Sequence, residues 1–251
     1  MTNSGKRVAW ITGGGSGIGE AGAEALAADG FIVVVSGRRK ELLDVVVAKI
    51  AAAGGQAEAI VLDVASADDV AKAAQQIVAG HGRIDVLVNS AGFNVTKRSF
   101  AEVDVEGWNK VVDINLNGIM YCMHAVLPAM RAQQDGIIIN ISSWAGVHPS
   151  KLTGPAYNAT KHALLALTHT FNMEECGNGL RACCLSPGEV ATPILKLRPR
   201  VPTEEEQAKM LQPEDLGRTI AFVASMPARV CINEILISPT HNRSFFAMLA
   251  S

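Results

Sequence analysis

A glycine-rich turn separates an apolar run from an alanine-rich segment close to the start of the chain. Residues 7–12 (RVAWIT) have the composition of a short buried strand, residues 13–19 (GGGSGIG) form the turn, and residues 20–29 have a helical pattern. Glycines let the backbone approach a pyrophosphate, whose charge is stabilised by the N-terminus of the following helix. A glycine cluster alone also suits an ordinary turn, but its place between a strand and a helix favours a dinucleotide site.

Apolar runs alternate with helical patterns along the rest of the chain. The expected strands cover residues 7–12, 31–36, 57–62, 84–88, 136–141, 179–185 and 230–237. The expected helices cover residues 20–29, 41–53, 68–79, 103–131, 155–176 and 213–224, with Ser66 as the N-cap of the third. This alternation predicts an α/β fold, a Rossmann-like, doubly wound parallel sheet of about seven strands with helices on both faces. No boundary or repeat divides residues 1–251, so we expect a single domain.

The composition of the chain argues against some classes of binding partner. The 251 residues are 49% hydrophobic and 18% charged, with a formal net charge of −2. The chain has no run of Lys and Arg and no interleaving of aromatic and basic residues, which argues against a nucleic-acid partner. The apolar stretches are too short to span a membrane, and no apolar signal region precedes the glycine turn. We therefore expect a cytoplasmic protein without a membrane partner.

Neither the cysteines nor the histidines form a recognisable ligand set. The spacing of the five cysteines matches no metal or redox motif, and we expect them to be small buried residues: Cys122, Cys176, Cys183, Cys184 and Cys231. His162 and His169 can share a helix face, but no carboxylate or cysteine completes a set around them. A metal site is not expected.

The end of the second expected strand bears on the choice of cofactor. Proteins that bind NAD usually carry an acidic residue there for the ribose hydroxyls. This chain instead has Ser36, Gly37, Arg38 and Arg39. Arginine suits a 2′-phosphate because its guanidinium binds bidentately. The two arginines also suit the solvated start of a helix, but we favour a phosphate role for Arg38 and therefore NADP, with NAD as the alternative.

Tyr157 and Lys161 (YNATK) lie one helical turn apart in the fifth expected helix. A free phenol has a pKa of about 10, which is too high for proton transfer at neutral pH. A neighbouring ammonium favours the phenolate, so we expect Lys161 to lower the pKa of Tyr157. The spacing is common on ordinary amphipathic helices, and by itself it is a weak signal.

In combination, these motifs resemble the classical short-chain dehydrogenase/reductase family over nearly the whole chain. The glycine turn is Thr12-Gly-Gly-Gly-Ser-Gly-Ile-Gly19, and Asn89-Ser-Ala-Gly92 has serine where a second asparagine is commoner. Ser143 is followed by Trp-Ala-Gly, and its distance in sequence to Tyr157 is one residue longer than usual. Pro187, Gly188 and Thr192 match the segment that holds the nicotinamide carboxamide and the phosphates.

The resemblance implies a catalytic tetrad of Asn115, Ser143, Tyr157 and Lys161. Tyr157 would be the general acid/base, Lys161 would lower its pKa and bind the nicotinamide ribose, and Ser143 would hydrogen-bond the substrate oxygen. Asn115 would position a water for proton relay. Ser143 could instead merely cap a turn. The implied cofactor contacts, with Asp63 and Val64 at the adenine, are Gly13, Ser16, Gly17, Ile18, Gly19, Arg38, Arg39, Asp63, Val64, Asn89, Ala91, Gly92, Tyr157, Lys161, Pro187, Gly188, Val190 and Thr192.

The polar segment 193–212 has the composition of a substrate lid, and several cations surround the expected substrate mouth. Arg98, Lys151, Arg198 and Arg200 would attract an anionic group if they converge, and Ser143 and Tyr157 would contact its reacting oxygen. These cations can also be solvated loop charges, since residues 204–206 are all glutamates. The C-terminal segments 211–216 and 226–237 resemble the branch of the family that acts on 3-hydroxy acids and β-hydroxy amino acids, typically with NADP.

The sequence therefore predicts an NAD(P)-dependent oxidoreductase that acts on an alcohol or ketone, with a small 3-hydroxy acid or another anionic hydroxy compound as substrate. The alternatives are a reductase of neutral ketones or 3-oxoacyl substrates, and a dinucleotide-binding sensor that has lost activity. An intact tetrad argues against the sensor. The resemblance also implies a homodimer or homotetramer, formed through the long apolar helices.

Overall fold

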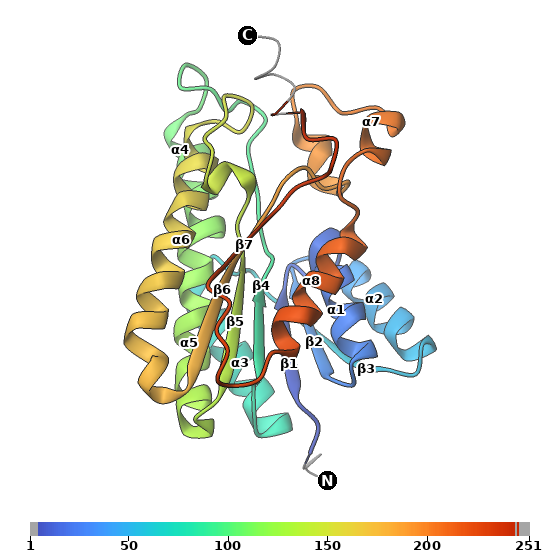
Figure 1. Cartoon of the computed structure of the whole chain (residues 1–251), viewed down its shortest axis with the longest axis vertical. Coiled ribbons are helices and arrows are strands. Elements are labelled where there is room, and N and C mark those ends of the chain that lie inside the picture. Colours follow the sequence, from blue (N-terminus) through green and yellow to red (C-terminus); the bar gives the residue numbers. More distant parts are fainter. Residues whose placement is uncertain (1–4, 244, 246–251) are drawn as a thin grey trace.

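Seven parallel strands form one sheet through the middle of the molecule (Figure 1), in the order β3-β2-β1-β4-β5-β6-β7. The computed structural model describes residues 5–243 and 245. The strands are β1 (Val8–Thr12), β2 (Ile32–Gly37), β3 (Gln56–Val61), β4 (Val86–Asn89), β5 (Gly136–Ile141), β6 (Leu180–Pro187) and β7 (Glu234–Ile237). The central strands are buried on both faces, which explains their continuous apolar composition. The predicted doubly wound sheet is confirmed.

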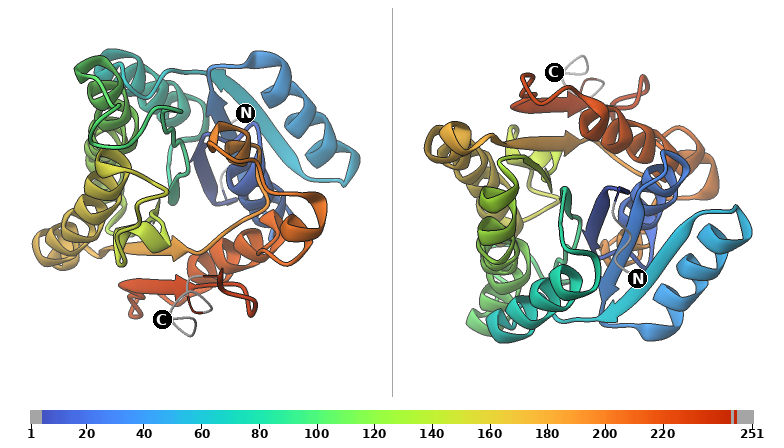
Figure 2. Two further views of the ribbon diagram at one scale, coloured as in Figure 1. Left: turned by 90° about the horizontal axis from the view of Figure 1, so that it is seen from above. Right: turned by 90° about the horizontal axis from the view of Figure 1, so that it is seen from below.

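Helices cover both faces of this sheet (Figure 2). One layer contains α1 (Gly17–Ala28), α2 (Lys40–Ala52) and α8 (Pro213–Ser225), while the other contains α3 (Ala67–His81), α4 (Val105–Val112), α5 (Gly118–Gln133) and α6 (Pro155–Glu175). Each layer buries its own apolar cluster against one face. As predicted, Ser66 caps α3, because its hydroxyl accepts the backbone N–H of Asp69 at 3.3 Å.

The helix expected over residues 103–131 is not continuous. A π-helical turn, Asp113–Asn117, separates α4 from α5. Such turns are rare and often mark functional positions. The hydrophobic pattern does not show this change, because the apolar residues on both sides keep facing the sheet.

Two other expectations are wrong at the C-terminal edge of the sheet. The last strand begins at Glu234 and not at residue 230. The Asn172 side chain hydrogen-bonds both the N–H and the carbonyl of Ala182 in β6, and the Arg181 guanidinium binds the carbonyl of Val230, so these groups do not form a ladder. Cys176 and Cys231 are exposed, whereas the other three cysteines are buried as expected. Both exposed thiols lie in connections outside the two helical layers.

The predicted lid segment is folded and lies above the carboxyl ends of the strands. It contains a 3₁₀ helix, Pro193–Leu197, and the short helix α7 (Glu204–Ala208). A bridge between Val190 and Leu211 joins the two ends of the segment. Figure 1 shows it at the same end of the molecule as the described end of the C-terminal segment.

Candidate active site

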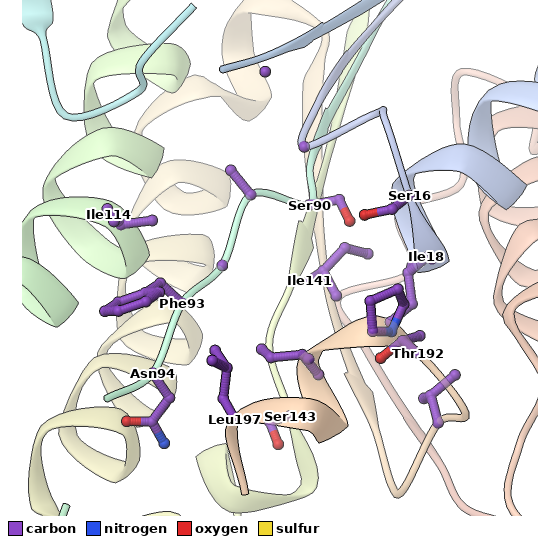
Figure 3. A pocket seen from close by; sticks show the side chains of 18 of the residues that line it. Ser16, Ile18, Ser90, Phe93, Asn94, Ile114, Ile141, Ser143, Thr192 and Leu197 are labelled. Carbon is purple, nitrogen blue, oxygen red and sulfur yellow. The ribbon is translucent and has the colours of Figure 1, made fainter. Parts of the chain in front are cut away.

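A long cavity lies at the carboxyl ends of the strands, where the order of the sheet reverses between β1 and β4. Ligands of open α/β sheets bind at this kind of position. In Figure 3, Ser16 and Ile18 come from the start of α1, Phe93 and Asn94 from the segment after β4, and Ser143 from the turn after β5. Segments far apart in the sequence therefore form one continuous wall.

The glycine turn packs closely against the neighbouring backbone, and the cavity beside the turn stays open for a ligand. Gly13 has a φ of +67°, and a Cβ there would lie 2.7 Å from the backbone nitrogen of Ala91. Only glycine allows this approach. At Gly92, which also lines the cavity, the nearest atom to a built Cβ is 3.9 Å away. The backbone of Gly13 and Gly17 lines the cavity at the start of α1, which fits the pyrophosphate of a dinucleotide.

The end of the cavity near β2 and β3 is basic. Nη2 of Arg39 donates to the Ser16 hydroxyl at 3.4 Å, and Nη1 of Arg38 lies 3.9 Å from the Asp63 carboxylate. All four side chains line the cavity. The guanidinium of Arg39 and the hydroxyl of Ser16 thus already form one polar cluster, which can surround a phosphate with donors. The residues present fit a phosphorylated adenosine.

Ser143, Tyr157 and Lys161 meet at the other end of the cavity. The Ser143 hydroxyl lies beside the phenol of Tyr157. It also accepts the backbone N–H of Ala145 at 3.2 Å, so it caps a turn as well. Nζ of Lys161 donates to the carbonyl oxygen of Ile141 at 2.7 Å and lies 5.6 Å from the centre of the Tyr157 ring. The side chains are therefore held before any ligand binds.

The expected lowering of the Tyr157 pKa by Lys161 is not found. Burial raises the pKa of Tyr157, and the opposing influences come from the Ser143 hydroxyl and from the charges of Arg198 and Arg98. Lys161 is itself only 3% exposed, and burial lowers its pKa to about 8. Its ammonium is directed to the Ile141 carbonyl. At neutral pH the protein alone thus holds a neutral phenol beside a lysine whose charge is disfavoured by burial.

Asn115 lies in the π-helical turn and does not line the cavity. Its amide oxygen accepts the backbone N–H of Phe93 at 2.8 Å, and its Nδ2 donates to the Phe93 carbonyl at 2.9 Å. The side chain therefore fixes the segment after β4, which forms one wall of the cavity. The water-positioning role stays a prediction.

Most of the cofactor contacts expected from the sequence line the cavity, but Gly19 and Asn89 do not. A Cβ at Gly19 would lie 2.4 Å from the Gly13 carbonyl oxygen, so this glycine allows α1 to pack on the turn. Asn89 is fully buried, and its Nδ2 donates to Oδ1 of Asn140 in the neighbouring strand at 2.9 Å. Both residues therefore support the cavity wall without lining the cavity.

The four candidate substrate cations do not converge. Arg98 and Arg198 line the cavity, whereas Lys151 and Arg200 lie outside it. Arg200 instead pairs with Glu206 at 2.9 Å. Sequence alone placed them together because their segments border the same mouth, but it could not show which side chains turn inward.

Glu189 and Asn94 are among the polar residues of the cavity that were not anticipated. Glu189 directly follows Pro187-Gly188 and pairs with Arg198 at 2.7 Å and with Arg243 at 2.5 Å. Asn94 is 4% exposed, and its Nδ2 donates to the Thr153 carbonyl at 2.9 Å. Their positions just after matched motifs were the available signal. Within residues 5–243 and 245, no cluster of His, Cys, Asp and Glu could hold a metal ion.

A family model for short chain dehydrogenases matches residues 7–201 of this chain. The chain belongs to this family. Cyclohexanol dehydrogenase of Acinetobacter sp. is 35% identical over 229 residues, which cover 87% of this chain and 88% of that protein. A metagenomic short-chain oxidoreductase in complex with NADP has a TM-score of 0.81 at 33% identity, covering 93% of this chain and 97% of that one. The closed form of a serine dehydrogenase complexed with NADP⁺ has a TM-score of 0.83 at 29% identity, covering 92% and 94%.

Membership of the short chain dehydrogenase family establishes the class of reaction. The protein is an NAD(P)-dependent oxidoreductase that acts on CH–OH groups. The predicted family and fold are thereby confirmed. In the described part of the chain, no helix has the length and the apolar character needed to cross a lipid bilayer.

Proposed function

We propose that this short chain dehydrogenase uses NADP to interconvert an alcohol and a carbonyl compound, with a small hydroxy acid as its substrate. The observation that carries the proposal is the meeting of Ser143, Tyr157 and Lys161 at one end of a cavity whose other end has Ser16 and Arg39. A dinucleotide lying along this cavity would bring its nicotinamide to Ser143 and Tyr157 and its adenosine to the arginines.

In this proposal Tyr157 transfers the proton and Ser143 orients the substrate. The bound cofactor supplies or accepts the hydride. In the reductive direction, the Ser143 hydroxyl binds the carbonyl oxygen, and the neutral phenol of Tyr157 donates its proton to that oxygen. Because its pKa is raised, Tyr157 carries its proton at neutral pH, which is the form that this step needs. Lys161, held by the Ile141 carbonyl, places a positive charge beside the phenolate that forms.

The preference for NADP rests on the basic end of the cavity. Gly37 provides no carboxylate for a ribose hydroxyl, while Arg38, Arg39 and Ser16 provide donors for a 2′-phosphate. Two of the similar structures, the metagenomic oxidoreductase and the serine dehydrogenase, contain NADP. We propose that NADP is held by these residues and by the other cofactor contacts predicted from the sequence.

The hydroxy-acid substrate is supported by the two arginines of the cavity and by the likeness to a serine dehydrogenase, whose name indicates a charged substrate. A neutral alcohol or ketone is the competing substrate class. The apolar side chains of Phe93, Leu195 and Leu197 favour it, as does the likeness to a cyclohexanol dehydrogenase. Both classes use the same proton-transfer residues.

The proposal is tested by following NADPH absorbance with a panel of 3-oxo acids and neutral ketones, in the wild type and in Tyr157→Phe. We expect the variant to lose more than 95% of the turnover, because the other hydroxyls in the described cavity wall belong to Ser and Thr, which are much weaker acids than a phenol. Binding of NADPH, measured by fluorescence, should stay within about twofold of wild type. Retained turnover in the variant would contradict the role of Tyr157, and NADPH binding without turnover of any substrate would favour a sensor.

A further inference from the structure

Arg98 is a buried cation in the wall of the cavity. Its residue is 7% exposed, and none of the ion pairs of the described residues includes it. Nη1 donates to the Leu152 carbonyl at 3.5 Å, and Nη2 donates to the Leu197 carbonyl. Nε is buried and has no hydrogen-bond partner. Carbonyl oxygens satisfy N–H groups but carry no full negative charge, so the guanidinium charge is not balanced.

The surroundings of Arg98 disfavour its charge in the absence of a ligand. Burial lowers the pKa of Arg98, the neighbouring positive charge of Arg198 lowers it further, and Tyr157 opposes the change. Arg98, Arg198 and Tyr157 all line the cavity, and the two positive charges favour the ionised form of the phenol. An anion beside Arg98 would relieve both the desolvation and the repulsion.

Arg198, unlike Arg98, has an acidic partner. Its guanidinium pairs with Glu189 at 2.7 Å, and the Glu189 carboxylate also pairs with Arg243. Arg200 pairs with Glu206 in the lid, and Lys151 is exposed outside the cavity. Of the four cations that the sequence suggested, Arg98 alone combines burial, a place in the cavity wall and the lack of an acidic partner in the described part of the chain.

A rigid scaffold fixes the position of Arg98. The Asn158 side chain, next to Tyr157, accepts from the Thr153 hydroxyl at 2.6 Å and donates to the Ser150 carbonyl at 3.0 Å, which holds the loop 150–153. Gly154 then packs directly on Arg98, because a Cβ there would lie 2.1 Å from the Arg98 carbonyl oxygen. The cation is therefore held close to the helix that carries Tyr157.

Asn94 fixes the same loop from the other wall of the cavity through its bond to the Thr153 carbonyl. Asn94, Ser143 and Leu197 all line the cavity (Figure 3). Arg98 thus connects three elements of the substrate pocket, which are the segment after β4, the loop before α6 and the lid.

We propose that Arg98 is the specificity-determining residue of the substrate pocket and that it binds the carboxylate of a small hydroxy acid, acting as the anion's main partner in place of Arg198, Arg200 and Lys151. This inference rests on the proposed function, since it assigns the substrate group that accompanies the reacting alcohol. A carboxylate two or three bonds from the alcohol carbon would let one small molecule contact Arg98 and Tyr157 together. The guanidinium would exchange its contacts with neutral carbonyl oxygens for two hydrogen bonds to the charged carboxylate of the substrate.

The test compares reduction of acetoacetate and methyl acetoacetate by NADPH in the wild type, Arg98→Gln, Arg198→Gln and Lys97→Gln. Lys97 is the exposed neighbour of Arg98, so its variant removes the same charge one residue away. We expect Arg98→Gln to lower kcat/KM for the acid at least 30-fold and for the ester less than threefold. The acid/ester ratio of Lys97→Gln should stay within twofold of wild type, and that of Arg198→Gln within about fivefold.

An unchanged acid/ester ratio in Arg98→Gln would overturn the inference, as would an equal or larger loss of acid preference in Arg198→Gln. Butyrate and butyramide provide a readout that needs no turnover. With NADPH bound, butyrate should raise the melting temperature of the wild type more than butyramide does, and this difference should vanish in Arg98→Gln. If the wild type reduces neither substrate, the proposed function fails, while this binding difference still supports or overturns the anion site.

Discussion

At the scale of single residues, Gly37 is the position at which cofactor preference can be changed most directly. It lies at the end of β2 and lines the cavity, and the nearest atom to a built Cβ is Cδ2 of Leu43 at 3.7 Å. Ordinary van der Waals contact at this distance leaves room for a side chain. A carboxylate there would face the space that Arg38 and Arg39 border, which in NAD-specific proteins accepts the ribose hydroxyls.

We expect Gly37→Asp to shift the preference from NADP toward NAD. The carboxylate would repel a 2′-phosphate and accept hydrogen bonds from a free ribose, so the ratio of kcat/KM for NADP to that for NAD should fall at least 30-fold, about 2 kcal/mol. Gly37→Asn is the matched control, because it adds nearly the same shape without the charge. A wild type that already prefers NAD, or an aspartate variant that behaves like the asparagine one, would contradict this prediction.

The residues of the proposed tetrad and their positions relative to the strands could be predicted from the sequence, because motif spacing fixes where each residue falls along a strand or helix. The pKa values of these residues and the partners of the charged side chains could not be predicted. The pKa of Tyr157 is raised because burial outweighs the neighbouring charges, and Lys161 is turned to the Ile141 carbonyl. Similarly, the partners of Arg198 and Arg200 lie at Glu189 and Glu206, which only the folded loops bring near them.

At the scale of elements, one carboxylate connects the lid to the segment after β6 and to the C-terminal segment. Glu189 pairs with Arg198 of the lid and with Arg243, while Glu206 of α7 pairs with Arg200 and lies 3.4 Å from Arg243. The Glu189 side chain is 23% exposed, so these pairs are less screened than ordinary surface pairs. Burial disfavours the charge of Glu189, but its two guanidinium partners outweigh burial and lower its pKa.

We expect Glu189→Gln to loosen the lid. Losing the charge of the shared carboxylate should cost ~1.5 kcal/mol of local stability and raise hydrogen exchange in residues 193–212 about tenfold at pH 7. Glu205→Gln is the control, because Glu205 is 83% exposed and pairs with Lys209 on the same surface. Its exchange should stay within twofold of wild type. Equal exchange in the two variants would show that the Glu189 pairs do not hold the lid.

The lowered pKa of Glu189 fixes the direction of the pH effect. The stability that these pairs contribute is fully present above the unfolded pKa of a glutamate, about 4.3, and is lost as the pH falls through the lower folded pKa. The difference in lid exchange between the wild type and Glu189→Gln, corrected for intrinsic exchange rates, should therefore be constant from pH 8 to 5. It should shrink in more acidic solution.

The elements themselves were largely predictable, because each strand and helix has its own period of apolar residues. The exceptions have tertiary causes. The Phe93 backbone binds Asn115 within the π-helical turn, and the Arg181 guanidinium binds the Val230 carbonyl ahead of β7. Neither contact is visible in the local sequence pattern, because the partners are 22 residues apart in the first contact and 49 residues apart in the second.

At the scale of the whole molecule, the predicted parallel sheet accounts for the buried residues but not for several apolar side chains on the outside. Val105 and Trp108 of α4, Met120 of α5 and Met173 of α6 are 75%, 37%, 42% and 72% exposed. All four belong to the helical layer that also carries Tyr157. Isolated exposed apolar residues are normal on a surface, but several large ones in one layer favour an interface.

We therefore expect a homodimer or homotetramer with twofold symmetry, in which this layer packs against its copy. Light scattering at 10 μM should give at least twice the monomer mass of 26.4 kDa. The double variant Trp108→Glu/Met120→Lys should shift the distribution toward smaller species, because it places charges in an apolar contact. Val45→Lys changes an apolar residue of α2 that is 51% exposed on the opposite layer, and it should leave the mass unchanged. A monomeric wild type would refute the oligomer, and equal effects of the two changes would place the interface elsewhere.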